Sequence, residues 1–155
     1  MVGNRKLLQY ALKSGLMQID ISYGNEKFSF NLNTELSINE SRINREAQEQ
    51  PSAYAFLNML HKKLIRSYKE AEKKMEKKHA QLFLKFKGEK DPDSGRQTAN
   101  EVAKAKVIKD QAYDDLWEEF IEAEHQAMVI EVCVKAFEQR VNLIQTLSAN
   151  LRKGN

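Results

Sequence analysis

Residues 61–90 have the sequence HKKLIRSYKEAEKKMEKKHAQLFLKFKGEK, and the spacing of side chains in this stretch decides the fold. Mainly apolar residues recur every three or four positions with no helix breaker before Gly88, which is typical of one face of a long α-helix. The series begins upstream and comprises Ala53, Leu57, Leu60, Leu64, Tyr68, Ala71, Met75, His79, Leu82 and Phe86. It predicts a helix over about residues 52–87, of the kind found in coiled coils and helical bundles.

A second long helix is predicted after the polar turn Gly88–Gly95, which contains Pro92. Its series predicts one helix over about residues 98–152 and comprises Val102, Ala105, Ile108, Ala112, Leu116, Phe120, Ala123, Ala127, Ile130, Val134, Phe137, Val141, Ile144, Leu147 and Leu151. Two long helices joined by a short turn pack antiparallel. The predicted fold class is therefore mainly α, a long, coiled-coil-like antiparallel helical hairpin.

The N-terminal part has a different pattern. Residues Arg5–Lys13 have the apolar spacing of a short amphipathic helix, which Ser14-Gly15 would end. Over residues 17–32, apolar and polar side chains alternate on both sides of a Gly-Asn turn, and this pattern predicts a β-hairpin. A two-stranded ribbon is marginal alone in water, so we expect it to pack on helices or to join a neighbouring subunit.

A third, polar helix is expected over about residues 37–50, with Pro51 marking a break or the first turn of the next helix. The chain is expected to consist of an N-terminal appendage, residues 1–32, and a helical hairpin domain, residues 33–155.

Composition limits the classes of protein. The chain has 155 residues, 41% of them hydrophobic and 30% charged, which suits one folded domain with an appendage. Its single cysteine, Cys133, forms no internal disulfide, and no apolar run approaches the roughly 20 residues that span a bilayer. The first residues lack the pattern of a secretory signal. We therefore expect a soluble intracellular protein without a membrane partner.

Nothing in the sequence indicates catalysis. His61, His79 and His125 have no metal-ligand spacing to one another or to Cys133. The Glu-x-x-His pair of di-iron bundles occurs once, at Glu122 and His125, without the required second copy. We expect no enzyme activity, no metal and no cofactor.

Charge is divided unevenly between the two long helices. Residues 61–90 carry eleven Lys or Arg against four Glu, whereas residues 101–131 carry nine Asp or Glu against three Lys. Clustered lysines supply the sequence-independent part of nucleic-acid affinity. Alternatively, the arm lysines at 62–78 pair with the acidic side chains at 110–124 across the hairpin. The candidate DNA-binding residues are Lys73, Lys74, Lys77, Lys78, Lys85, Lys87, Lys90 and Arg96.

The later part of the second long helix is apolar on more than one face, which indicates burial on more than one side. Self-association is the simpler way to bury this surface, so we expect a homo-oligomer. The candidate oligomerisation residues are Met128, Val129, Ile130, Val132, Cys133, Phe137, Val141 and Ile144.

Several short segments occur in an order that is found in one known family. They are Glu46-Ala47, Pro51-Ser52-Ala53-Tyr54, Glu70-Ala71-Glu72-Lys73-Lys74, the glycine turn, Glu101-Val102, Cys133-Val134-Lys135-Ala136-Phe137, Arg140-x-x-x-Ile144 and Arg152-Lys153-Gly154. From about Asn39 to the C-terminus the chain resembles the UvsY-like recombination mediators of tailed phages.

The resemblance implies a non-enzymatic protein that forms a ring, binds single-stranded DNA, helps to displace single-strand-binding protein and loads a recombinase. It also implies the cytoplasm of an infected bacterial host as the location, if the chain is phage-encoded. The alternative is a structural or interaction protein, such as a virion component or a coiled-coil chaperone, without DNA binding.

Overall fold

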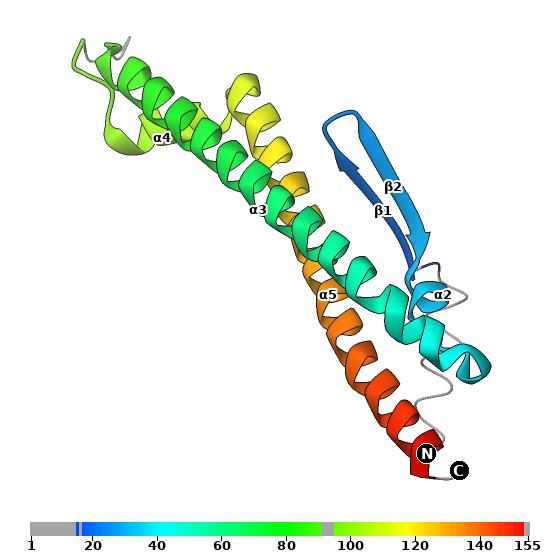
Figure 1. Ribbon diagram of the computed structural model, residues 1–155. Helices are drawn as coiled ribbons and strands as arrows, with labels where there is room; N and C mark the ends of the chain where they lie inside the picture. The colour runs from blue at the N-terminus through cyan, green and yellow to red at the C-terminus, as the bar shows by residue number, and fades with distance from the viewer. Residues whose placement is uncertain (1–14, 16, 91–94, 154–155) are drawn as a thin grey trace. The chain divides into compact units, whose positions relative to one another are not determined.

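The computed structural model describes residues 15, 17–90 and 95–153. The helix expected at Arg5–Lys13 and the centre of the turn, residues 91–94, lie outside the described residues. The chain forms two compact units: a terminal unit, residues 1–62 and 128–155, and a central unit, residues 63–127. Most of the described chain is helical, as the sequence predicts (Figure 1).

The predicted β-hairpin is present in the terminal unit. Strands β1 (Gln18–Tyr23) and β2 (Glu26–Asn31) pair antiparallel, with Ile19 opposite Phe30 and Ile21 opposite Phe28. Gly24 opens the two-residue turn at φ 59°, the positive value that a type II′ turn requires at its first central position. Ile19 and Ile21 of β1 are buried and Phe28 and Phe30 of β2 are half-buried, so the apolar face of the hairpin is the covered one.

The segment after the hairpin differs from the expected helix at 37–50. Helix α2 covers Leu32–Leu36, a 3-10 turn η1 covers Glu40–Arg42, and helix α3 begins only at Ile43. Polar side chains explain the interruption because they compete with helical hydrogen bonds. The Ser37 hydroxyl donates to the Thr34 carbonyl, and the Asn39 side chain accepts from the Ser41 amide.

Helix α3 runs from Ile43 to Gly88 without a break, so the expected boundary at Pro51 is wrong. The proline ring is exposed, and it removes only the hydrogen bond to the Ala47 carbonyl, at a cost of about 3 kcal/mol. Anchors to α5 on both sides of the proline offset this loss. The Gln50 side chain donates to the Phe137 carbonyl at 3.0 Å, and the Tyr54 hydroxyl donates to Glu138 at 2.5 Å.

The single helix expected at 98–152 is also wrong, because it is divided into α4 (Asn100–Ile108) and α5 (Gln111–Lys153). Asp110 causes the division: its carboxylate accepts from the amides of Ala112 and Tyr113 and so caps α5. The buried face of α4 is consequently offset from the predicted series. Ala103 and Val107 are fully buried, whereas the predicted Val102, Ala105 and Ile108 are exposed.

Within each unit, α3 and α5 run antiparallel. Residue numbers that rise along α3 fall along α5 in the contacts Glu46–Arg140 and Tyr54–Glu138 of the terminal unit. The same holds for Tyr68–Phe120 and His79–Tyr113 in the central unit. The helical hairpin is thus confirmed, and every member of the apolar series on α3 is buried or half-buried.

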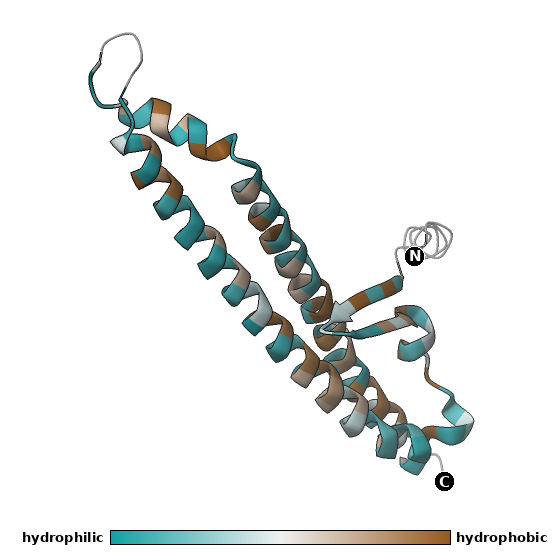
Figure 2. Cartoon of the chain, turned by 90° about the horizontal axis from the view of Figure 1, so that it is seen from above, coloured by the Kyte–Doolittle hydropathy of each residue, from teal (hydrophilic) through white to brown (hydrophobic). Residues whose placement is uncertain are grey.

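The core of each unit is built from the predicted apolar positions. Figure 2 shows apolar residues recurring among hydrophilic ones along the long helices. No helix in the described ranges is both long enough and apolar enough to span a bilayer. The terminal core includes Ile19, Ile21, Leu32, Ile43, Leu57, Leu60, Ile130, Cys133, Val134, Phe137 and Ile144; the central core includes Leu64, Met75, Leu82, Ala103, Val107 and Ala127.

Candidate nucleic-acid interface

The candidate DNA-binding lysines lie along α3 in the central unit. Lys73, Lys74, Lys77 and Lys85 are exposed, and Lys78 is half-buried. Lys73 and Met75 are two residues apart, which places them about 200° apart around the helix. Because Met75 is buried in the core, Lys73 points away from it. Lys77, also two residues from Met75, points outward in the same way.

These lysines form no charge zipper across the hairpin. Ion pairs in the described part of the central unit include Arg66–Glu70, Lys104–Glu101 and Lys106–Glu89. Within the same residues, Lys73, Lys74, Lys77 and Lys78 form no ion pair with an acidic side chain. The charge of these four lysines therefore remains available to a ligand, and at these four positions the structure departs from the alternative of pairing across the hairpin.

Aromatic contacts join α3 and α5 in the central unit. The alternative interpretation of the sequence expected ion pairs between these helices. Tyr68 lies 5.6 Å from Phe120, and His79 lies 5.6 Å from Tyr113, both measured between ring centroids. Trp117 joins the two contacts, at 5.9 Å from Phe120 and 6.3 Å from Tyr113. Aromatic pairs at these separations stabilise beyond the area that they bury. Periodicity did not predict these contacts, because Tyr113 and Trp117 lie outside both apolar series.

Phe83 and Phe86 take part in packing. The Phe83 ring is parallel to that of His79 at a centroid distance of 6.5 Å. The ammonium groups of Lys85 and Lys106 lie 5.4 and 5.7 Å from the centre of the Phe86 ring. Both rings are half-buried, so they serve packing more than a stacking platform for bases.

The remaining candidate cations lie where the chain enters and leaves the turn. Lys87 donates to the Thr98 carbonyl at 2.9 Å, while the Thr98 amide and hydroxyl both donate to the Glu89 carbonyl. Lys87 therefore has a structural contact that fixes the two ends of the turn. Lys90 and Arg96 are both exposed, and the backbone of Lys90 forms an isolated antiparallel β-bridge with Gln97.

The acidic side of the central unit is also visible in its electrostatics. The negative charge of Glu72, with smaller contributions from burial and from Glu124, raises the pKa of the Tyr68 hydroxyl. Glu72 and Glu124 come from different helices, so α3 and α5 share an acidic flank.

The candidate oligomerisation residues divide into two groups in the terminal unit. Ile130, Cys133, Phe137 and Ile144 are buried within the chain itself, so its own core already uses them. Val129 and Val141 are half-buried. Met128 and Val132, in contrast, are 56% and 61% exposed, and they remain open to contact with another chain.

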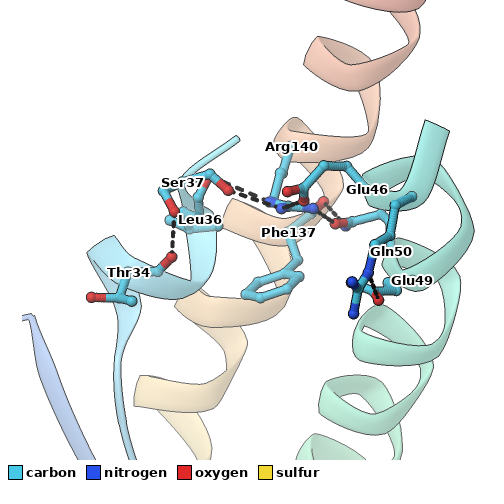
Figure 3. A network of polar contacts seen from close by, with 9 residues as sticks. Thr34, Leu36, Ser37, Glu46, Glu49, Gln50, Phe137 and Arg140 are labelled. Carbon is cyan, nitrogen blue, oxygen red and sulfur yellow. Dashed lines mark hydrogen bonds and ion pairs between the residues drawn. The ribbon is translucent and has the colours of Figure 1, made fainter. Parts of the chain in front are cut away.

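Arg140 forms a polar centre in the terminal unit that sequence reasoning did not identify (Figure 3). Its side chain is 9% exposed and pairs with Glu46 and Gln50 of α3. It also donates to the carbonyls of Leu36 and Ser37 at 3.3 and 2.9 Å. The available signal was an arginine between Phe137 and Ile144 on the apolar face of α5. These contacts fix the start of α3 and the segment before it to α5.

The described residues contain no group of three or more His, Cys, Asp or Glu side chains placed to hold a metal. Glu122 accepts a hydrogen bond from Gln126. Burial raises the pKa of the Cys133 thiol, which disfavours the reactive thiolate. Comparison of the chain with known protein families, with curated proteins and with solved structures found no match.

Proposed function

We propose that this protein is a non-enzymatic, single-stranded DNA-binding recombination mediator. The observation that carries the proposal is the exposed row of lysines on α3, which have no acidic partner within the described residues. Lysines in this state are available to neutralise phosphates and release counterions. The buried thiol of Cys133 is not part of this surface.

The shape of the lysine row favours a single strand as the ligand. Lys73 and Lys77 are one helical turn apart, a rise of about 6 Å along a straight helix. A duplex backbone winds away from a straight row, whereas a flexible single strand can follow a basic surface. The resemblance to UvsY-like mediators supplies the further steps: displacement of single-strand-binding protein and loading of a recombinase. A homo-oligomer, held in part by Met128 and Val132, would place several such rows around one strand.

The test is a titration of fluorescent single-stranded and double-stranded oligonucleotides at two salt concentrations, with light scattering on the same sample. We expect salt-sensitive binding that prefers the single strand. In the variant Lys73→Ala/Lys74→Ala/Lys77→Ala, the loss of three phosphate contacts should lower the slope of log affinity against log salt by about 2. The control Lys27→Ala/Arg42→Ala/Lys135→Ala removes the same charge elsewhere and should keep the slope.

A structural or interaction protein is the second candidate, and exposed apolar side chains in the terminal unit favour it. Phe56 and Met59 are 49% and 61% exposed, in addition to Met128 and Val132. This candidate predicts an oligomer that has no affinity for single strands even at low salt. That result would overturn the mediator proposal, as would an unchanged salt slope in the lysine variant.

A further inference from the structure

The basic surface of the central unit contains an apolar residue that packing does not explain. Leu84 is 71% exposed, the highest value among the exposed large apolar side chains of the described chain. It follows Lys73 by eleven residues and Lys77 by seven, so the three side chains share one face of α3. We call Lys73, Lys77 and Leu84 the basic apolar face.

Helix α5 carries a face of the same kind with the opposite charge. Trp117 and Ile121 are 42% and 45% exposed and lie one turn apart. Asp114 precedes Trp117 by three residues, and Glu118 lies one turn after Asp114. Asp114 and Glu118 are both exposed and form no ion pair with another described residue. We call Asp114, Trp117, Glu118 and Ile121 the acidic apolar face.

One chain does not bring its own two faces together. The basic apolar face is on the side of α3 opposite to the buried Met75 and Leu82. In the described residues of the central unit, no ion pair joins Lys73 or Lys77 to Asp114 or Glu118. Each face therefore has an exposed apolar centre beside charged side chains that form no ion pair within the described residues.

We propose that the acidic apolar face of one copy docks onto the basic apolar face of a second copy. Leu84 would pack against Trp117 and Ile121 while the lysines pair with Asp114 and Glu118. Charge complementarity selects this occupant for the acidic apolar face, since its carboxylates would repel nucleic acid and a second copy carries the matching lysines and leucine. Such a contact joins two different surfaces, and it generates a ring or a filament when it is repeated. It does not depend on the proposed DNA binding.

The direct test is cross-linking of two single-substitution proteins in the absence of nucleic acid. Leu84→Cys and Ile121→Cys are mixed and oxidised; Cys133 is retained because it is fully buried. A disulfide-linked dimer between positions 84 and 121 should form in the mixture at least tenfold faster than with the control pair Leu84→Cys and Gln139→Cys. Equal rates with the two pairs would overturn the proposal.

Charge exchange gives an independent test with full-length protein. Lys73→Glu/Lys77→Glu and Asp114→Lys/Glu118→Lys should each lower the average mass in sedimentation at low salt, since each retains only one matching face. Mixing the two variants should restore it. The control Lys27→Glu/Arg45→Glu has the same change in net charge as Lys73→Glu/Lys77→Glu and should keep the wild-type mass. Circular dichroism checks that each variant is folded, and failure of the mixture to recover would contradict the proposal. DNA titration of the same proteins is scored separately, so failure of either proposal is recognised on its own.

Discussion

Arg140 shows what one buried charge does in a chain whose other charges are mostly exposed. All three of its guanidinium nitrogens donate, to two side chains of α3 and to the carbonyls of Leu36 and Ser37. Removing one partner of a buried ion pair leaves the other partner charged and desolvated. The consequence is a measurable dependence of the terminal unit on this residue.

We expect Arg140→Met to lower the free energy of unfolding by about 3 kcal/mol, because Glu46 and the two carbonyls lose their donors. Urea denaturation followed by circular dichroism measures the change. Lys135→Ala breaks an exposed pair with Glu131 on the same helix and serves as the control, with no clear shift in midpoint expected. Similar midpoints for the two variants would show that the Arg140 contacts do not stabilise the fold.

The reactivity of the Cys133 thiol gives a second measure of the folding of the terminal unit. Since burial raises its pKa in the folded chain, we expect no reaction with a thiol reagent at pH 8 until the unit unfolds. The unfolded thiol ionises near its ordinary pKa of 9.0, so it releases its proton at a lower pH than the folded thiol. Stability should therefore fall as the pH rises through 9.0 toward the folded pKa. The rate of labelling against urea concentration checks the first expectation, and fast labelling in water would contradict it.

At the scale of the elements, periodicity predicted the segments whose apolar residues pack into a core. The helix boundaries depended on individual side-chain contacts. The β-hairpin and the long apolar series of α3 follow from spacings of two and of three to four residues. Pro51 and Asp110 were misjudged in opposite directions. The contacts of Gln50 and Tyr54 outweigh the tendency of Pro51 to break a helix. The carboxylate of Asp110, in contrast, is sufficient to separate α4 from α5. The first outcome is not visible without knowing which side chains meet α5, whereas the second rests on a local N-cap.

The continuity of α3 through Pro51 can be tested directly. Pro51→Ala restores the amide that can donate to the Ala47 carbonyl, and we expect the free energy of unfolding to rise by about 1 kcal/mol. The gain is smaller than the full proline penalty because the unfolded alanine chain has more conformations to lose. Thermal melting measures it. A lower stability of Pro51→Ala would mean that the proline is needed where it lies.

The division between α4 and α5 can be tested by a substitution at Asp110. Asp110→Ala removes the acceptor of two amide hydrogen bonds at 3.1 and 3.3 Å. We expect a loss of about 1 kcal/mol in urea denaturation, the usual value of an N-cap. Asp114→Ala, also in the first turn of α5 but without a capping bond, is the control. An equal loss in both variants would assign the effect to charge near the helix start.

For the whole molecule, the sequence located the basic surface but could not show whether it was exposed. The uneven charge of the two helices was evident, and so were Lys73 and Lys77 as candidates. Whether they pair across the hairpin depends on which side chains of α3 and α5 meet, and those residues are far apart in the sequence. The burial of Ile130 and Cys133 within one chain likewise follows from the packing of α5, which periodicity alone does not specify.

The two proposals make one joint prediction, because Lys73 and Lys77 serve both the strand and the second copy. A single strand bound along α3 would cover the basic apolar face and exclude the acidic apolar face of a neighbour. We therefore expect the yield of the 84–121 cross-link to fall as a single-stranded oligonucleotide is added, in proportion to the strand bound. The fall should be absent at a salt concentration that prevents strand binding. If the strand binds fully while the cross-link yield stays constant, the two ligands use different surfaces, and the lysines that contact DNA must lie elsewhere on the chain.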